Sequence, residues 1–115
     1  MEQLNRIEIR GYVGSVARYN GGEKPMIRLT VATSVAFKDR SGAAVIETTW
    51  HNLIAWEGRN VQNLDKIEKG SRVYAVGRLR SQKYTGMDGV DRVSYEIQAS
   101  KLDLLPDDGP FQYEM

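Results

Sequence analysis

Two tryptophans on one predicted strand are the residues with the clearest chemistry in this sequence. Trp50 and Trp56 are six residues apart in an apolar, β-branched stretch. They therefore share one strand face, about 20 Å apart at a rise of ~3.3 Å per residue. If His51, Leu53 and Ala55, on the other face, line the core, both indole rings point outward. Outward aromatic rings of this kind stack on unpaired nucleic-acid bases, at roughly 1–3 kcal/mol per base and without regard to sequence.

Basic residues accompany the other candidate aromatics. Arg40 follows Phe37 closely, and Arg80 and Lys83 precede Tyr84. Aromatics interleaved with cations suit a stacked, phosphate-bearing strand. The alternative is that either tryptophan is a core residue at a barrel corner or a contact between subunits.

Enzymatic chemistry has few candidate residues. The chain has one His and no Cys, and it contains no Gly-rich phosphate loop. Asp88 and Asp91 fall in a predicted hairpin and are expected to be solvated turn residues. His51, beside Trp50 on a strand, is expected to be packed or interfacial rather than catalytic. The sequence thus predicts no enzyme, no cofactor and no metal site.

The elements that must position these residues are mostly strands. Apolar residues recur with period two, the pattern of strands half buried on one face. Gly-bearing turns separate them, suited to positive φ in hairpin loops. One stretch predicts a helix, from about Arg59 to Glu68, because Val61, Leu64 and Ile67 recur every three residues and Gly70 supplies a stop. The predicted strands cover about 7–13, 27–31, 46–56, 73–79 and 93–99.

This order, three strands, one short helix and two strands, predicts an all-β fold: a five-stranded Greek-key barrel of the OB type. The helix between the third and fourth strands is expected to plug the barrel's open end. At 115 residues and 41% apolar content, the chain suits one domain, predicted at 1–105. Pro106 breaks the pattern, which predicts a short, acidic, disordered tail over 106–115.

Charge and composition narrow the setting. Residues 1–102 hold all 16 Lys and Arg against 11 acids, whereas 103–115 hold four acids and no base, so a basic body carries an acidic tail. No run approaches the ~20 apolar residues that span a bilayer, and the first residues lack a secretory apolar stretch. We therefore expect a cytoplasmic, nucleoid-associated protein without a membrane partner.

Five motifs together resemble the bacterial single-stranded DNA-binding protein family. The resemblance runs in register from about Asn5 to Leu105, with the motifs in the family's order and spacing. They are Asn5-Arg6-Ile7 leading to Gly11 and Gly14, Leu29-Thr30-Val31-Ala32-Thr33-Ser34, Glu47-Thr48-Thr49-Trp50-His51, Lys69-Gly70-Ser71-Arg72-Val73-Tyr74 and Gly77-Arg78-Leu79-Arg80.

The resemblance implies binding and protection of single-stranded DNA during replication, recombination or repair. It also implies a homotetramer with DNA wrapped around it and subunit contacts near His51 and Tyr74. The base-stacking positions it implies are Phe37, Trp50, Trp56 and Tyr84. The phosphate contacts it implies are Arg40, Lys69 and Lys83, to which the charge pattern adds Arg80.

The tail departs from the family, which usually ends a long linker in an acidic tip closed by Pro-Phe. Here the similar Asp107-Asp108-Gly109-Pro110-Phe111 follows the predicted barrel almost directly, and four residues come after it. Asp107, Asp108, Pro110 and Phe111 either recruit replication and repair proteins or only tune DNA affinity.

Two other functions remain open at this stage. A dimeric accessory protein of the primosomal type would use the same barrel mainly to bridge protein partners. A structural adaptor would bury the tryptophans in a protein interface and never meet nucleic acid.

Overall fold

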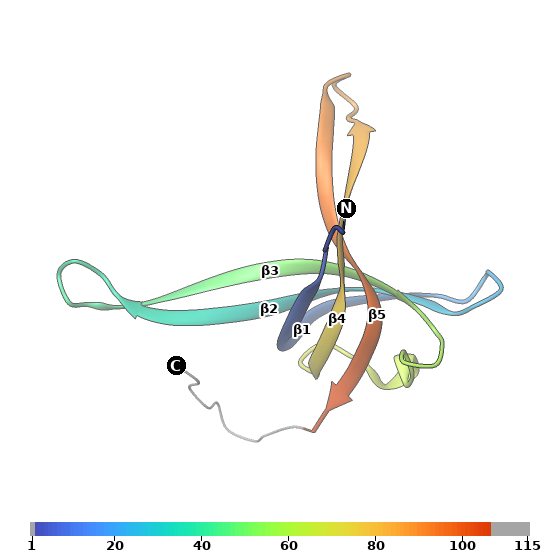
Figure 1. The fold of residues 1–115 in the computed structure, drawn as a ribbon, viewed down its shortest axis with the longest axis horizontal. Helices are drawn as coiled ribbons and strands as arrows, with labels where there is room; N and C mark the ends of the chain where they lie inside the picture. Colours follow the sequence, from blue (N-terminus) through green and yellow to red (C-terminus); the bar gives the residue numbers. More distant parts are fainter. Residues whose placement is uncertain (1, 107–115) are drawn as a thin grey trace.

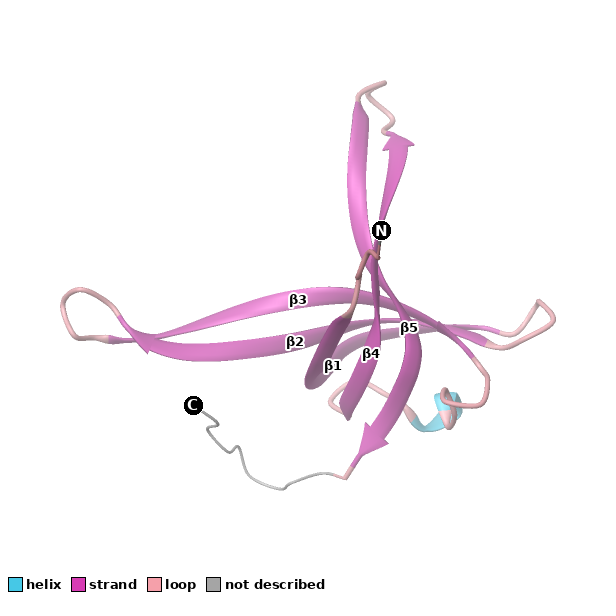
Figure 2. Cartoon of the chain, in the orientation of Figure 1, coloured by secondary structure: helices cyan, strands magenta, loops and turns pink. Residues whose placement is uncertain are grey.

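The structure of the chain, a computed structural model, describes residues 2–106. Within that range nearly all of the regular structure is β (Figure 2), which confirms the all-β class. The strands are β1 (Ile7–Tyr19), β2 (Met26–Lys38), β3 (Ala44–Trp56), β4 (Arg72–Thr85) and β5 (Asp91–Leu105), and a 3-10 turn, η1 (Leu64–Lys66), lies between β3 and β4.

The five strands close into a barrel in the order β1-β2-β3-β5-β4, with β4 pairing back to β1. All neighbours are antiparallel except a short parallel contact between β3 and β5 at Leu53 and Ile54. Closure requires β1 to bend, because its first half pairs with β4 and its second half with β2. A register shift at Gly14, between Val13 and Ser15, supplies this bend as a β-bulge. The predicted five-stranded OB-type barrel is confirmed.

Alternation along the strands builds the core. Ile27, Leu29 and Val31 of β2 are buried, and the residue between each pair points away from the core. On β3, Leu53 and Ile54 are both buried. Because consecutive residues of a strand point to opposite faces, both faces of β3 are used at this point, as its composition predicted.

The helix predicted from Arg59 to Glu68 is wrong. Only the one turn of η1 forms, because Asn63 takes a left-handed conformation (φ 62°) and Val61 instead bridges to Gly58 and Leu102. The residues whose spacing of three predicted the helix are nevertheless core residues. Val61, Leu64 and Ile67 are all buried in the core cluster, so the segment covers the barrel through turns and η1 instead of a helix.

Two hairpins project beyond the barrel as arms (Figure 1). The β2–β3 arm ends in the loop 39–43, and the β4–β5 arm ends in the loop 86–90. Gly42 (φ 86°) and Gly89 (φ 78°) adopt the positive φ that the predicted turns need. Outside the barrel the alternation has no core to cover, which explains why Leu79 and Tyr95 are exposed rather than half buried.

Candidate functional site

Both indole rings lie on the outside of the barrel. The side chain of Trp50 is 59% exposed and that of Trp56 is 39% exposed, whereas Leu53 on the other face of β3 is 2% exposed. Asn52 and Ile54 lie between the two tryptophans on their own face. The outward orientation expected from parity is therefore present in the structure.

Gly14 of β1 provides the seat for the Trp50 ring. A Cβ added to Gly14 would lie 2.3 Å from Cζ3 of Trp50 and 3.1 Å from the Oγ1 of Thr30. Since Trp50 pairs with Ala32 of β2, its ring reaches across β2 to the bulge of β1. This contact could not be predicted from the sequence, because a bulge has no signature in the alternation.

An open groove of about 380 Å³ adjoins this face. Thr30 and Asn52 line it from β2 and β3, and Gln82 and Glu96 line it from β4 and β5. Thr30 stands opposite Asn52 in the β2–β3 register. The groove therefore borders the row of side chains between the two tryptophans.

An ion pair crosses this groove. Nη1 of Arg28 on β2 donates to Oε2 of Glu96 on β5 at 2.9 Å, across the intervening strand β3. Nη1 of Arg80 approaches the other oxygen, Oε1, at 4.0 Å, and Gln82 Nε2 lies 3.5 Å from it. Sequence reasoning missed Arg28 and Glu96 as site residues. The signal was available, since Arg28 occupies an outward position in the alternation of β2.

Phe37 and Arg40 lie on the β2–β3 arm. Phe37 is 46% exposed and follows the alternation of Val31 and Val35, so it sits on the face of the arm opposite that of Trp50. Arg40 is exposed in the loop at the tip. Phe37 and the groove therefore lie on opposite faces of the β2–β3 ribbon.

Asp39 shapes the loop that carries Arg40. Its Oδ1 accepts hydrogen bonds from the hydroxyl of Ser41 (2.6 Å), the backbone N–H of Ser41 (2.8 Å) and that of Ala43 (3.0 Å). The Ser41 hydroxyl bond, followed by the Ala43 backbone bond, lowers the pKa of Asp39 below its usual 3.8. The ionised carboxylate thus organises the tip of the arm.

Tyr84, Arg80 and Lys83 lie on the β4–β5 arm. Tyr84 is 48% exposed and alternates in phase with Arg80 and Gln82, the face that borders the groove. Lys83 alternates with Leu79 on the opposite face. Tyr84 and Arg80 thus share the face of β4 that presents Gln82 to the groove without lining the groove themselves, and Lys83 lies on the other face.

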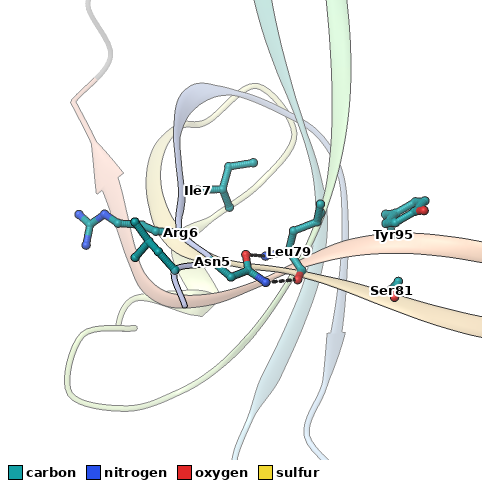
Figure 3. A pocket seen from close by; sticks show the side chains of 7 residues that line it. Asn5, Arg6, Ile7, Leu79, Ser81 and Tyr95 are labelled. Carbon is teal, nitrogen blue, oxygen red and sulfur yellow. Dashed lines mark hydrogen bonds between the residues drawn. The ribbon is translucent and has the colours of Figure 1, made fainter. Parts of the chain in front are cut away.

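A second open pocket lies where the N-terminal segment meets the β4–β5 arm (Figure 3). The Asn5 side chain mimics a strand there: its Nδ2 donates to the carbonyl of Leu79 at 2.7 Å, and its Oδ1 accepts from the Leu79 N–H at 2.9 Å. Tyr95 lines this pocket farther along the arm. Asn5 therefore covers the edge of β4 just beyond the end of its pairing with β1.

Lys69 is exposed in the turn before β4. The next residue, Gly70, donates its N–H to the carbonyl of Val13 at 2.8 Å. Val13 directly precedes the bulge at Gly14, on which the Trp50 ring rests. The fold thus brings the Lys69 backbone to the same part of β1 as the Trp50 ring.

His51 and Tyr74 are partly buried and hydrogen bonded. Nε2 of His51 lies 2.8 Å from the hydroxyl oxygen of Thr33. A hydrogen bond with the side chain of Glu8, on the neighbouring strand, raises the pKa of Tyr74, and Lys101 Nζ lies 5.6 Å from its ring centre. The tail residues Asp107, Asp108, Pro110 and Phe111 lie outside the described residues.

The described residues hold neither a metal-binding cluster nor a membrane-spanning helix. Residues 2–106 contain no cluster of three His, Cys, Asp or Glu side chains able to hold a metal ion. The same range has no helix long and apolar enough to cross a membrane.

A closed OB-type barrel with outward tryptophans beside a groove that holds an arginine defines a class of protein, the oligonucleotide-binding barrels. The model of the single-strand binding protein family matches residues 4–105. The chain belongs to this family.

Curated relatives and a solved structure agree with this assignment. The single-stranded DNA-binding proteins of Neisseria meningitidis serogroups A and B are each 34% identical over 104 residues, 89% of this chain and 60% of theirs. That of Xanthomonas campestris is 32% identical with the same coverage. The structure of Plasmodium falciparum SSB in complex with ssDNA superposes with a TM-score of 0.76, at 29% identity over 92% of this chain and 98% of that one. The chain spans about three-fifths of the length of these curated relatives.

Proposed function

We propose that this chain binds single-stranded DNA without strong sequence preference. The observation that carries the proposal is the pair of exposed indole rings on one face of β3, beside a groove that is lined by Arg28 of β2 and by Glu96, which Arg80 of β4 approaches. A folded domain that leaves two tryptophans in water has a surface suited to a flat, apolar partner. Unpaired bases are flat and carry phosphates, which explains why cations border the same surface.

The contacts divide into stacking and charge. Trp50 and Trp56 hold bases along β3, and Arg80 holds phosphate at the edge of the groove. Because Phe37 and Lys83 lie on the far faces of their arms, the bound strand has to curve around both arms to meet them. The proposed stacking residues are Phe37, Trp50, Trp56 and Tyr84, and the proposed phosphate contacts are Arg40, Lys69, Arg80 and Lys83.

The wider role follows from the same binding mode. We propose that residues 1–105 form the DNA-binding domain of a homotetramer, with His51 and Tyr74 near the subunit contacts. The assembly protects single strands in the cytoplasm during replication, recombination or repair and performs no catalysis. The acidic segment from Asp107 to Phe111 recruits partner proteins or tunes DNA affinity.

Fluorescence titration tests the binding. The only two tryptophans in the chain lie at the proposed site, so oligo-dT should quench the intrinsic emission at low salt. The affinity should fall as salt rises, with a slope of about −0.7 in log K against log salt per phosphate neutralised. Absence of quenching at low salt would contradict the proposal.

Substitution separates stacking from folding. Trp50→Ala should weaken binding by roughly 1–3 kcal/mol, whereas Trp50→Phe keeps a ring and should retain most of the affinity. Loss of assembly with intact DNA binding in Trp50→Ala would instead favour a protein interface. Sedimentation of the free protein tests the tetramer, and a dimer with weak affinity would favour the accessory role.

A further inference from the structure

The ion pair between Arg28 and Glu96 lies in the path of any strand that stacks on both tryptophans. In the β2–β3 register Arg28 stands opposite Ile54, a buried residue midway between Asn52 and Trp56 on the outward face of β3. Glu96 belongs to β5 on the other side of β3. The bridge joining them therefore passes over β3 between the two indole rings.

The charges of this bridge are unequal in exposure. The side chain of Glu96 is 11% exposed, whereas those of Arg28 and Arg80 are 48% and 45% exposed. One carboxylate thus faces two guanidinium groups and a side-chain amide from Gln82. Glu96 is the anion of a groove whose proposed ligand is a polyanion, and it neutralises cations that phosphates would otherwise attract.

We propose that Arg28 is a phosphate-binding residue that Glu96 restrains in the free protein, and that single-stranded DNA displaces Glu96 when it binds. This inference rests on the proposed function and adds a residue pair that sets its affinity. The Arg28 side of this ion pair is half exposed, so salt screens it. When Arg28 leaves, the nearly buried Glu96 carboxylate still has Arg80 and Gln82 beside it. A phosphate is a comparable partner for guanidinium, so the exchange requires only a rotation of the Arg28 side chain.

Four proteins test the exchange by oligo-dT titration: the wild type, Glu96→Gln, Arg28→Gln and the double variant. Glu96→Gln should bind about five- to tenfold more tightly at low salt, because a like charge in contact range of a phosphate is removed. Its salt slope should be steeper by up to about 0.7, the share of one phosphate. In the double variant this gain should largely disappear, since Arg28 is the residue that Glu96 releases.

The matched control is Asp65→Asn. Asp65 is exposed in η1, which carries none of the proposed DNA contacts, and its substitution changes the net charge equally. It should leave affinity within about twofold of the wild type. An equal gain from Asp65→Asn, or a Glu96→Gln gain that persists without Arg28, would overturn the exchange, because Glu96 would then act only as general negative charge.

A measurement on the unmutated protein guards against variants that fail to fold. The Nε–H resonance of Arg28 in a ¹⁵N spectrum should move on addition of oligo-dT, and an unmoved resonance in the DNA-bound protein would overturn the proposal. The wild-type titration distinguishes failure of the proposed DNA binding from failure of the proposed ion-pair exchange. If oligo-dT fails to quench the wild type, DNA binding itself is refuted, whereas quenching with uncoupled variants refutes only the exchange.

Discussion

Gly14→Ala should disturb the proposed DNA-binding surface while leaving the fold intact. The added Cβ would lie 2.3 Å from Cζ3 and 2.8 Å from Cη2 of Trp50, whereas carbon atoms pack at about 3.5–4.0 Å. The ring therefore has to move away by about 1 Å or more. Gly14 does not have a positive φ, so the backbone itself accepts alanine.

The size of the effect on stability and on binding depends on which group moves to relieve the clash. Since Trp50 is 59% exposed, its ring can swing into solvent, and the free energy of unfolding should change by less than about 1 kcal/mol. Stacking is worth roughly 1–3 kcal/mol per base. A displaced ring that loses part of that energy should weaken oligo-dT binding by about fivefold.

The assay uses a Trp56→Phe background, in which Trp50 is the sole indole. Gly14→Ala should shift the emission to longer wavelength and weaken the oligo-dT affinity, while urea unfolding stays close to that of the parent. Gly11→Ala is the contrasting control, because its Cβ would lie 2.1 Å from the backbone carbonyl oxygen of Ala32. Backbone cannot swing aside, so that variant should lose about 2 kcal/mol or more of stability. Unchanged emission and affinity in Gly14→Ala would refute the reasoning.

Three further predictions concern the scaffold. Arg18→Ala removes two hydrogen bonds to backbone carbonyls of the segment that covers the barrel, and urea unfolding should show a loss of about 1.5–3 kcal/mol, with Arg18→Lys recovering only part. Hydrogen bonds from Ser41 and neighbouring amides lower the pKa of Asp39 below its unfolded value of about 3.9. They therefore stabilise the loop at pH values above the unfolded pKa, and this stabilisation is lost as the pH falls through the lower folded pKa. An NMR titration of the Asp39 carboxyl with a midpoint at or above the unfolded pKa would contradict this. Ile27→Ala should cost about 2–5 kcal/mol in thermal unfolding because Ile27 is fully buried, whereas Ile46→Ala, at an exposed site, should stay within about 0.5 kcal/mol.

The barrel could be predicted because alternation and turn chemistry are local signals. Strand phase placed Trp50 and Trp56 outside, and Gly42 and Gly89 marked the turns of the arms. The same kind of signal gave a wrong helix between β3 and β4. The residues spaced by three there are buried, but a non-helical segment with a left-handed Asn63 buries them. A local sequence pattern thus predicts which residues are buried, but it does not determine the backbone conformation in which they are buried.

The parts of the site that escaped prediction depend on contacts between strands. Arg28 and Glu96 are 68 residues apart, and only the barrel's strand order brings them within hydrogen-bond distance. The separation of Lys83 from Tyr84 was readable from their adjacent positions on one strand. The sequence did not indicate which of the two faces of β4 borders the groove, and the structure supplies that information.

The two arms also imply uneven local stability within one small domain. Their strands are hydrogen bonded to one neighbour beyond the barrel and cover no core of their own, so their amides should exchange hydrogen by local openings that leave the barrel folded. Proposed ligand contacts on these arms can therefore rearrange at little energetic cost, while those on the barrel wall stay fixed. In such a molecule one rigid platform can fit chains of differing path and curvature.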